Sequence, residues 1–327
     1  SDISAQVLTG LIAELQQTEA QDRWLKRSEL ARMQAKIEEA FSALPMPVAR
    51  LDGFDNCRDL CQQCLQWLRR GEAMLTQRNA LWTDHMLEQH ADFFATVEST
   101  PLNAAQARAV VNGEDALLVL AGAGTGKTSV LVARAGWLLL RQQAQPQQIL
   151  LLAFGREAAE EMNQRIKTRL QNENIEARTF HALALHIIRE GSNKQPTISR
   201  LESDDAARRQ LLIETWRQQC AEKKAHASGW RQWLTEELAW TVPEGDFWQD
   251  EMLTQRLASR LERWLGLMRM HGGAQAAMIA DAPEAVRDSF AKRIKLMAPL
   301  LKAWKSALKE EGAVDFSGLM HQAINLD

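Results

Sequence analysis

The chain has 327 residues and a formal net charge of −3 at pH 7. This length suffices for two or three domains with large cores. The balanced charge excludes a polycation, so any nucleic-acid site must be a local groove. No apolar run approaches the roughly 18 residues of a membrane span, and the polar N-terminus lacks a secretory signal pattern. We therefore expect a cytoplasmic protein that does not associate with membranes.

The first hundred residues are predicted to be helical. Apolar residues recur at helical spacing from Ile3 to Phe41 and again from about residue 56 to residue 97. Pro45 and Pro47 separate the two stretches, and Gly71 is a candidate interruption of the second. No group of catalytic residues is visible here. We expect residues 1–98 to form an all-helical module with a docking or scaffolding role.

The cysteines of this module have two interpretations. Cys57, Cys61 and Cys64 have the spacing of an iron–sulfur ligand run, with Cys220 as a conceivable fourth ligand. On a helix, however, the first three form a single stripe beside several leucines. Cysteine is among the most buried residue types when it has no chemical role. We favour the core stripe over the metal cluster.

A new helix is predicted shortly after Pro101, which marks a boundary. Asn103 and Gln106 occupy its N-cap and third positions, so the glutamine side chain can complete a capping box. Alternatively, its amide, which is both a donor and an acceptor, reads the adenine edge of a nucleotide held about fifteen residues later.

Residues 116–132 predict a strand, a phosphate-binding loop and a helix. The apolar run 117–120 predicts a buried strand, and the run after Lys127 and Thr128 predicts a buried helix that ends near Arg141. Glycines let backbone N–H groups converge on phosphate oxygens, and the helix N-terminus favours an anion. Lys127 would reach the β and γ phosphates, and the Thr128 hydroxyl would hold Mg²⁺. We therefore predict a site for ATP and Mg²⁺ with Lys127 and Thr128 as catalytic residues.

The loop departs from the usual G-x-x-x-x-G-K-[ST] pattern at its first position, where the chain has alanine. Three glycines remain, and the flanking apolar runs supply the context of a phosphate loop. Besides Gln106, the predicted nucleotide-binding residues are Ala121, Gly122, Ala123, Gly124, Thr125, Gly126, Lys127, Thr128 and Ser129.

Strands and helices continue to alternate after this loop. A second buried strand is predicted at 149–154, a helix with one apolar face at 158–170, and a third short strand that ends at Thr179. This order is typical of an α/β fold with a parallel sheet. Ligands bind outside the carboxyl ends of such strands, where the loop, Phe154 and His181 are expected to lie.

Residues 182–312 are helix-biased and contain seven of the eleven tryptophans, interleaved with lysines and arginines. Aromatic and cationic side chains together suit single-stranded nucleic acid. For each individual tryptophan we favour a place in a helical core, with the cations on the outer face. Residues 314–316 then indicate a return to the sheet domain.

Five sequence blocks in order resemble the opening motifs of UvrD/Rep-like superfamily 1 DNA helicases. They are LNAAQ (102–106), AGAGTGKT (121–128), LLLAFGREAAEEM (150–162), TFHALA (179–184) and VDFSGLM (314–320). The resemblance covers the chain from about residue 100 onward. It implies a RecA-like P-loop domain with a parallel sheet at 99–185, a helical inserted domain at 186–312 and a return to the first domain at 313–327.

The resemblance also implies an ATP-dependent translocase and helicase that acts on single-stranded DNA or DNA junctions in repair or recombination. Gln106 would recognise adenine. Many relatives have Thr-Asn-Lys after the phenylalanine of the third block, whereas this chain has Gly-Arg-Glu, so a backbone contact and an arginine–phosphate contact are the candidates there. The implied DNA contacts are Phe154, Gly155, Arg156, Thr179, Phe180 and His181.

In the family, an Asp-Glu pair follows soon after the Asp-Phe of the fifth block, and a second RecA-like domain follows that pair. Neither feature occurs after the fifth block within these 327 residues. Since both contribute to phosphoryl transfer, we expect the chain to bind nucleotide and to hydrolyse it poorly. A second class of function stays open, namely a nucleotide-binding interaction module. In that case the N-terminal helices dock a partner protein and the phosphate loop acts as a switch.

Overall fold

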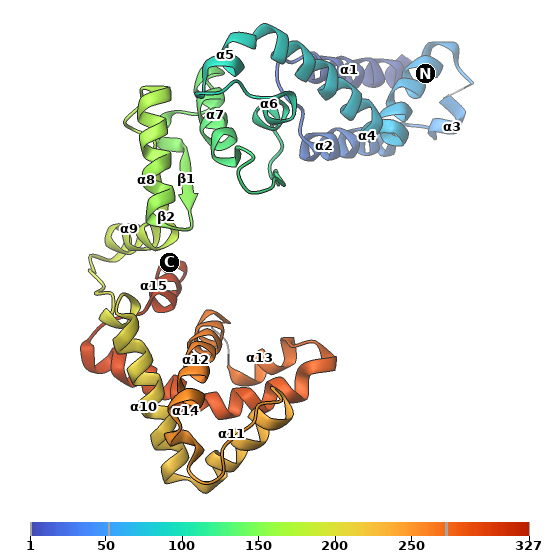
Figure 1. The fold of residues 1–327 in the computed structure, drawn as a ribbon. Helices are drawn as coiled ribbons and strands as arrows, with labels where there is room; N and C mark the ends of the chain where they lie inside the picture. The colour runs from blue at the N-terminus through green and yellow to red at the C-terminus, as the bar shows by residue number, and fades with distance from the viewer. Residues whose placement is uncertain (1, 52, 272–273, 327) are drawn as a thin grey trace. The chain divides into compact units, whose positions relative to one another are not determined.

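A computed structural model describes residues 2–51, 53–271 and 274–326 (Figure 1). The chain divides into two compact units, Ser1–Arg178 and Thr179–Asp327. Among the described residues, no helix combines the length and the apolar character that crossing a membrane requires.

The first unit begins with helices, as predicted. They are α1 (Asp2–Glu19), α2 (Arg27–Ala43), α3 (Val48–Leu51), α4 (Asp55–Gln89) and α5 (Ala91–Thr96). Helices α1 and α2 both pack against the long helix α4. Together with α3 and the segment between α1 and α2, they bury an apolar core that includes Leu8, Leu25, Ile37 and Leu51. This burial of one face of each helix stabilises the module.

Gly71 does not interrupt α4, contrary to the sequence-based expectation. The helix continues through it. A Cβ atom at this position would lie 2.8 Å from Gln34 Nε2 and 2.9 Å from Leu30 Cδ1. The glycine therefore permits the close approach of α2 to α4, and the intact backbone hydrogen bonds of a long packed helix outweigh its low helix propensity.

The cysteine stripe lies in the core, as favoured from the sequence. Cys57, Cys61 and Cys64 of α4 are fully buried, and they belong to the core shared with α1 and α2. Cys220 is buried in the core of the second unit. Burial raises the pKa of the Cys64 thiol to about 11, and the neighbouring Cys61 contributes to this shift. Burial also raises the pKa of the Cys220 thiol to about 12.

The remainder of the first unit has α/β character. It contains α6 (Ala104–Val111), α7 (Lys127–Leu140), the turn η1 (Pro146–Gln148), β1 (Leu150–Ala153), α8 (Arg156–Arg165), the π-helical turn η2 (Ile166–Leu170) and β2 (Glu176–Thr179). Strands β1 and β2 form a small parallel sheet. From the end of α7 onward, the order strand, helix, strand agrees with the prediction. Apolar side chains of α7, α8 and both strands share one core.

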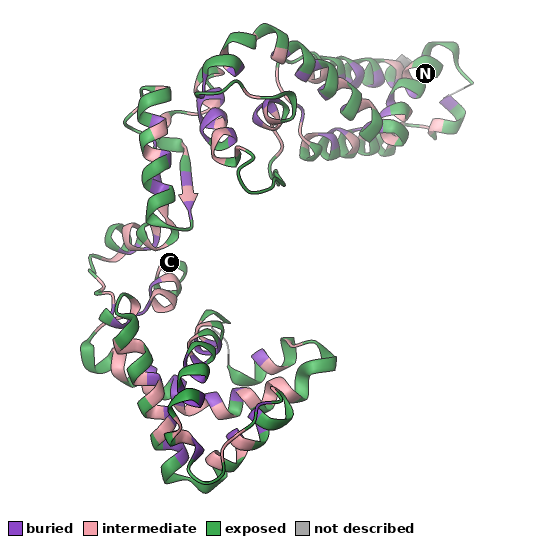
Figure 2. Cartoon of the chain, in the orientation of Figure 1, coloured by how far each residue is buried: buried purple, intermediate pink, exposed green. Residues whose placement is uncertain are grey.

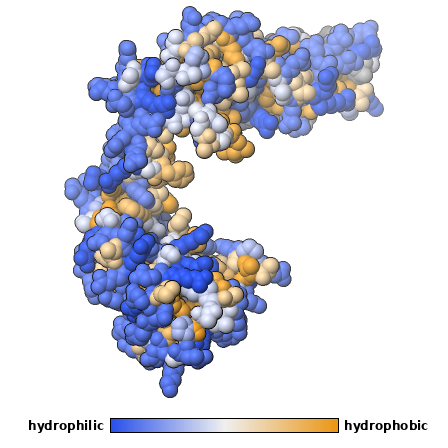
Figure 3. Space-filling model, viewed as in Figure 1, coloured by the Kyte–Doolittle hydropathy of each residue, from blue (hydrophilic) through white to orange (hydrophobic). Residues whose placement is uncertain are grey.

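The strand predicted at 117–120 does not form. These residues have no regular secondary structure, and Leu118 and Leu120 are 80% and 85% exposed. Hydrophobic surface is visible on this part of the unit in Figure 3. A parallel strand requires neighbours that accept its hydrogen bonds and cover both faces. In the described residues, β1 and β2 pair with each other and neither pairs with the run 117–120, which is therefore left uncovered.

The second unit is almost entirely helical. Its helices are α9 (Phe180–Ser192), α10 (Asp205–Glu222), α11 (Lys224–Glu236), α12 (Glu251–His271), α13 (Gln275–Asp281), α14 (Arg287–Glu311) and α15 (Phe316–Ile324). Short 3₁₀ turns lie at η3 (Arg200–Glu202), η4 (Phe247–Gln249) and η5 (Glu284–Val286). Figure 2 shows buried residues along the facing sides of these helices.

The tryptophans of the second unit fill its core, which confirms the interpretation favoured for each of them. Trp248 is partly buried and packs against this core. The fully or nearly fully buried ones are Trp216, Trp230, Trp233, Trp240, Trp264 and Trp304. Several indole rings meet edge to face, an arrangement that adds to the energy of burial.

The chain segment around Val314 returns to α9, the helix that directly follows β2. Val314 forms a parallel bridge with Ile198. Helix α15 packs on α9, and Leu319 shares a small core with Ala184 and Ile188. Both the fourth and the fifth helicase-like sequence blocks therefore meet in the second unit.

Burial of the thiols leads to a prediction about their reactivity. In the folded protein at pH 8, Cys64 and Cys220 should not react with Ellman's reagent, because the thiolate is the nucleophile and their raised pKa values suppress it. All four cysteines should react after unfolding in guanidinium chloride. Rapid labelling of Cys64 in the folded protein, located by mass spectrometry, would contradict its place in the core.

Candidate nucleotide-binding site

The predicted phosphate loop has the backbone conformation that its glycines permit. Gly124 and Gly126 have φ values of +73° and +84°, in the left-handed region that residues with a Cβ atom adopt at a cost. The Thr125 hydroxyl donates to Gly122 O at 2.6 Å, and Lys127 Nζ donates to Ala121 O at 3.3 Å. Since Ala121 contributes its carbonyl group, alanine at the first position of the motif is compatible with this loop.

Helix α7 begins directly at the loop. Gly126 is its N-cap and supplies no side chain to cap the helix. The N–H groups of the first helical turn have no acceptor within a helix, and the helix dipole places partial positive charge there. Lys127, Thr128 and Ser129 occupy this turn. The loop and the helix start therefore present the donors and the charge that a polyphosphate requires.

Gln106 connects helix α6 to the loop. The Asn103 backbone N–H donates to Gln106 Oε1 at 2.9 Å, and the Gln106 backbone N–H donates to Asn103 Oδ1 at the same distance. This capping box confirms one of the two interpretations of Gln106. The amide group also donates from Nε2 to Thr125 O at 3.1 Å, so the same side chain contacts the phosphate loop. Recognition of adenine stays a prediction.

The body of α7 is fixed by its neighbours within the first unit. Trp137 is buried and stacks on Phe94, with their ring centroids 5.5 Å apart. Arg134 donates to Val110 O at 2.9 Å and also to Asn112 O, at the end of α6. Arg141 donates to the backbone carbonyl of Asp22 at 2.8 Å, in the segment between α1 and α2. The helix that carries the loop is therefore held by α6 and by the N-terminal helices.

Arg165 is a charged neighbour of the loop that the sequence did not reveal. It lies outside the apolar face predicted for residues 158–170, yet its side chain is only 28% exposed. It donates to Ser129 Oγ at 3.3 Å and lies 3.5 Å from the carboxylate of Glu98, whose side chain is 2% exposed. No local pattern could have indicated this contact, because Glu98 lies far earlier in the chain and outside any recognisable motif.

Three predicted DNA contacts follow β1 in the first unit. Phe154 is 98% exposed, an unusual position for a phenylalanine. Gly155 is the N-cap of α8, and Arg156 is the first residue of that helix and is exposed. The aromatic ring and the guanidinium group thus lie next to each other in sequence on the surface at the end of the strand.

The other three predicted DNA contacts lie at the start of the second unit. Thr179 caps α9 by accepting a hydrogen bond from Ala182 N at 3.2 Å, and Phe180 is 40% exposed. The His181 ring stacks on Phe316 with the centroids 3.9 Å apart. Burial lowers the pKa of His181, which favours the neutral imidazole. Phe316 therefore covers one face of this ring, and a shared groove with the residues after β1 stays a prediction.

Two family models match the chain. The UvrD/REP helicase N-terminal domain matches residues 102–326, a range that includes all five helicase-like sequence blocks. The chain belongs to the UvrD/REP helicase family. The model of the DNA helicase IV / RNA helicase N terminal matches residues 1–69, within the N-terminal helices. The resemblance predicted from the sequence blocks is therefore confirmed.

Individual members of the UvrD/REP family differ in how much of the chain they match. DNA helicase IV from Escherichia coli (strain K12) is 64% identical over 324 residues, which are 99% of this chain and 47% of the relative. A probable DNA helicase II homolog from Rickettsia conorii is 40% identical over 102 residues, 31% of this chain and 15% of the relative. The helicase PcrA from Staphylococcus aureus (strain Mu50) is 37% identical over 95 residues, 28% and 13% respectively. The chain thus spans about half the length of the E. coli relative.

The Arg165–Glu98 pair should contribute to the stability of the first unit. Arg165→Ala leaves the buried Glu98 carboxylate without its cation, and we expect the free energy of unfolding to fall by about 2 to 3 kcal/mol, below the range for fully buried pairs because the arginine is partly exposed. Urea denaturation measures this change. Glu98→Gln in the Arg165→Ala background should restore most of the loss, whereas Arg169→Ala on the exposed face is the neutral control. A parental midpoint for Arg165→Ala would refute the role of the pair.

Proposed function

We propose that the chain binds ATP and Mg²⁺ and contacts single-stranded DNA as part of an ATP-dependent superfamily 1 DNA helicase that acts in DNA repair or recombination. The observation that carries this proposal is the phosphate loop, whose two left-handed glycines lead into α7 with Lys127 at its first position. Membership of the UvrD/REP family supports the same conclusion. The name of the E. coli relative describes a DNA helicase.

In this proposal, different groups of the loop contact different parts of the nucleotide. The backbone N–H groups from Gly122 to Ser129 would surround the phosphates, and Lys127 would contact the β and γ phosphates. The Thr128 hydroxyl, in the first turn of α7, would hold Mg²⁺. When bound, this ion neutralises charge on the phosphates. The position of Gln106 against Thr125 supports its proposed contact with adenine.

In the proposed domain organisation, residues 99–185 form a RecA-like domain to which residues 313–327 return, residues 186–312 form the inserted helical domain, and residues 1–98 form the N-terminal module. The proposed DNA contacts are the six residues after β1 and β2. The exposure of Phe154 supports a role in stacking on a base, which is worth roughly 1 to 3 kcal/mol in single-strand binding. Arg156 beside it is the proposed phosphate contact.

The nucleotide site can be tested with Lys127→Ala. The lysine is exposed and makes no contribution to the core, so the variant should fold normally. Loss of a charge-assisted contact to phosphate should weaken binding of ATP with Mg²⁺ about tenfold to a hundredfold in calorimetry. Lys36→Ala, which removes an exposed lysine from α2, is the matched control. Unchanged affinity in a Lys127→Ala protein with the parental circular dichroism would refute the site.

Gln106 can be tested with two substitutions. Gln106→Ala removes the capping box and should lower the free energy of unfolding by about 1 kcal/mol, and it should also abolish the preference for ATP over GTP. Gln106→Glu keeps an oxygen that accepts from the Asn103 N–H but loses the amide donor. It should therefore keep the capping box, lose the contact with Thr125 O and lose the base preference. If Gln106→Glu discriminates ATP from GTP as well as the parent does, the residue only caps α6.

A further inference from the structure

Three arginines of the second unit converge on one surface hollow. Arg260 and Arg263 of α12 and Arg293 of α14 line a depression of about 580 Å³. Its other lining residues are Ser259, Trp264 and Leu267, so the lining contains three cations and no carboxylate. A concave site with this composition is suited to an anion.

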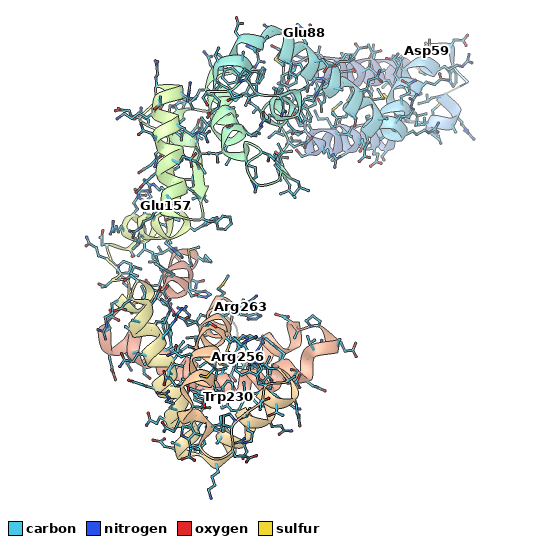
Figure 4. All side chains as sticks on the ribbon, in the orientation of Figure 1. Asp59, Glu88, Glu157, Trp230, Arg256 and Arg263 are labelled. Carbon is cyan, nitrogen blue, oxygen red and sulfur yellow. The ribbon has the colours of Figure 1, made fainter. Side chains whose placement is uncertain are left out.

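The cationic surface extends beyond the hollow along α12. Arg256, Arg260 and Arg263 are spaced four and three residues apart, so they lie on one face of the helix, and all three are exposed. They span about 10 Å along the helix axis. Figure 4 labels Arg256 and Arg263 on this helix, and Figure 3 shows hydrophilic surface in the same region. The opposite side of α12 is buried in the tryptophan-rich core. The result is a row of cations rather than a single charge.

Aromatic rings beneath the arginines fix their orientation. The guanidinium carbon of Arg256 lies 4.1 Å from the centroid of the Trp240 ring, and that of Arg260 lies 5.4 Å from the same ring. Arg293 lies 5.1 Å from the ring of Trp264. A guanidinium group over an aromatic face keeps its in-plane N–H donors available. These side chains are thus partly ordered before any ligand binds, which reduces the entropic cost of binding.

The charges of these four arginines, Arg256, Arg260, Arg263 and Arg293, are not neutralised within the part of the chain that the structure describes. None of them forms a salt bridge with a described carboxylate, in contrast to Arg208 and Arg209, which both pair with Glu262 of α12. Burial lowers the pKa of Arg293, as expected for a cation that has lost water without gaining an anion. An anionic ligand would supply the missing charge.

We propose that Arg256, Arg260, Arg263 and Arg293, the arginine row, bind the phosphodiester backbone of DNA. A row of cations matches a ligand with repeated negative charges better than it matches a single anion such as a nucleotide. Leu267, which is 53% exposed at the hollow, offers an apolar contact for a sugar or a base. Contacts to phosphates position DNA without reading its sequence. This inference rests on the proposed function, and it adds a DNA contact in residues 186–312 that is separate from Phe154 and Arg156.

The test is the salt dependence of DNA binding by the 327-residue chain. Fluorescence anisotropy with a labelled single strand and with a labelled duplex would be measured from low to physiological salt. For Arg260→Ala/Arg263→Ala, the slope of log K against log salt should flatten by roughly 1.4 for the single strand or 1.8 for the duplex, as expected for two lost phosphate contacts. Flattening in one arm alone identifies that form of DNA as the ligand of the row, and flattening by the expected amount in both arms shows that the row binds either form.

Two variants serve as matched controls, and a third is a second test variant. Lys305→Ala/Lys309→Ala removes the same charge from exposed positions further along α14 and should leave the slope unchanged. Arg260→Lys/Arg263→Lys keeps the charge and should keep most of the slope. Arg263→Gln, at a position without a ring contact in the structure, should give about half of the flattening and carries the test if the double alanine variant does not fold.

Several results would overturn the inference. A parental slope for both Arg260→Ala/Arg263→Ala and Arg263→Gln would do so. The proposed function would still stand, since ATP binding through Lys127 is measured separately. An equal effect of the two lysine substitutions would show that only total charge matters. Competition by polyglutamate as strong as that by DNA of equal charge would indicate an acidic protein as the ligand. If the parent binds no DNA at low salt, the inference and the proposed DNA contacts are both wrong, while the nucleotide site is judged by calorimetry.

Discussion

The packing around Trp137 is the interaction on which the candidate nucleotide site depends. This side chain is buried among the rings of His90, Phe93 and Phe94, all of which precede the helicase domain that the family model matches. Because Trp137 lies on α7, the helix that begins at the predicted phosphate loop packs directly against the N-terminal helices. The loop itself is exposed and glycine-rich, so its position follows from the helix that carries it.

The second unit is organised around a buried carboxylate in a comparable way. Asp315 accepts hydrogen bonds from Gly318 N at 2.7 Å, Trp304 Nε1 at 2.8 Å and Arg269 at 3.1 Å. Burial opposes ionisation, but these donors outweigh it and lower the pKa of Asp315. The aspartate of the fifth sequence block thus joins α12, α14 and the start of α15. In this structure Asp315 has a structural role, because its carboxylate oxygens accept hydrogen bonds from these three helices.

Local patterns predicted those parts of the site that depend on neighbours in sequence. The capping box of Asn103 and Gln106, the helix start at Lys127 and the exposed Phe154 after β1 all lie within a few residues of the features that indicated them. The contact of Gln106 with Thr125 was not predicted, because the two interpretations of the glutamine concerned other partners, namely the Asn103 backbone and an adenine base. The Arg165–Glu98 pair was not predicted either, because charge periodicity on a helix cannot identify a partner from a distant segment.

The sequence by itself determined the family and the helical and α/β character of the segments, and it predicted the glycine-rich loop before α7 and favoured the cysteine stripe, because these follow from short-range spacing of residue types. Only the tertiary structure decided which apolar and charged residues are covered. The run 117–120 has the composition of a buried strand, yet burial requires partner strands that local sequence cannot supply. Similarly, Arg260 and Arg293 line one hollow only because α12 and α14 pack together. The tryptophans of these two helices are core residues because neighbouring helices cover them.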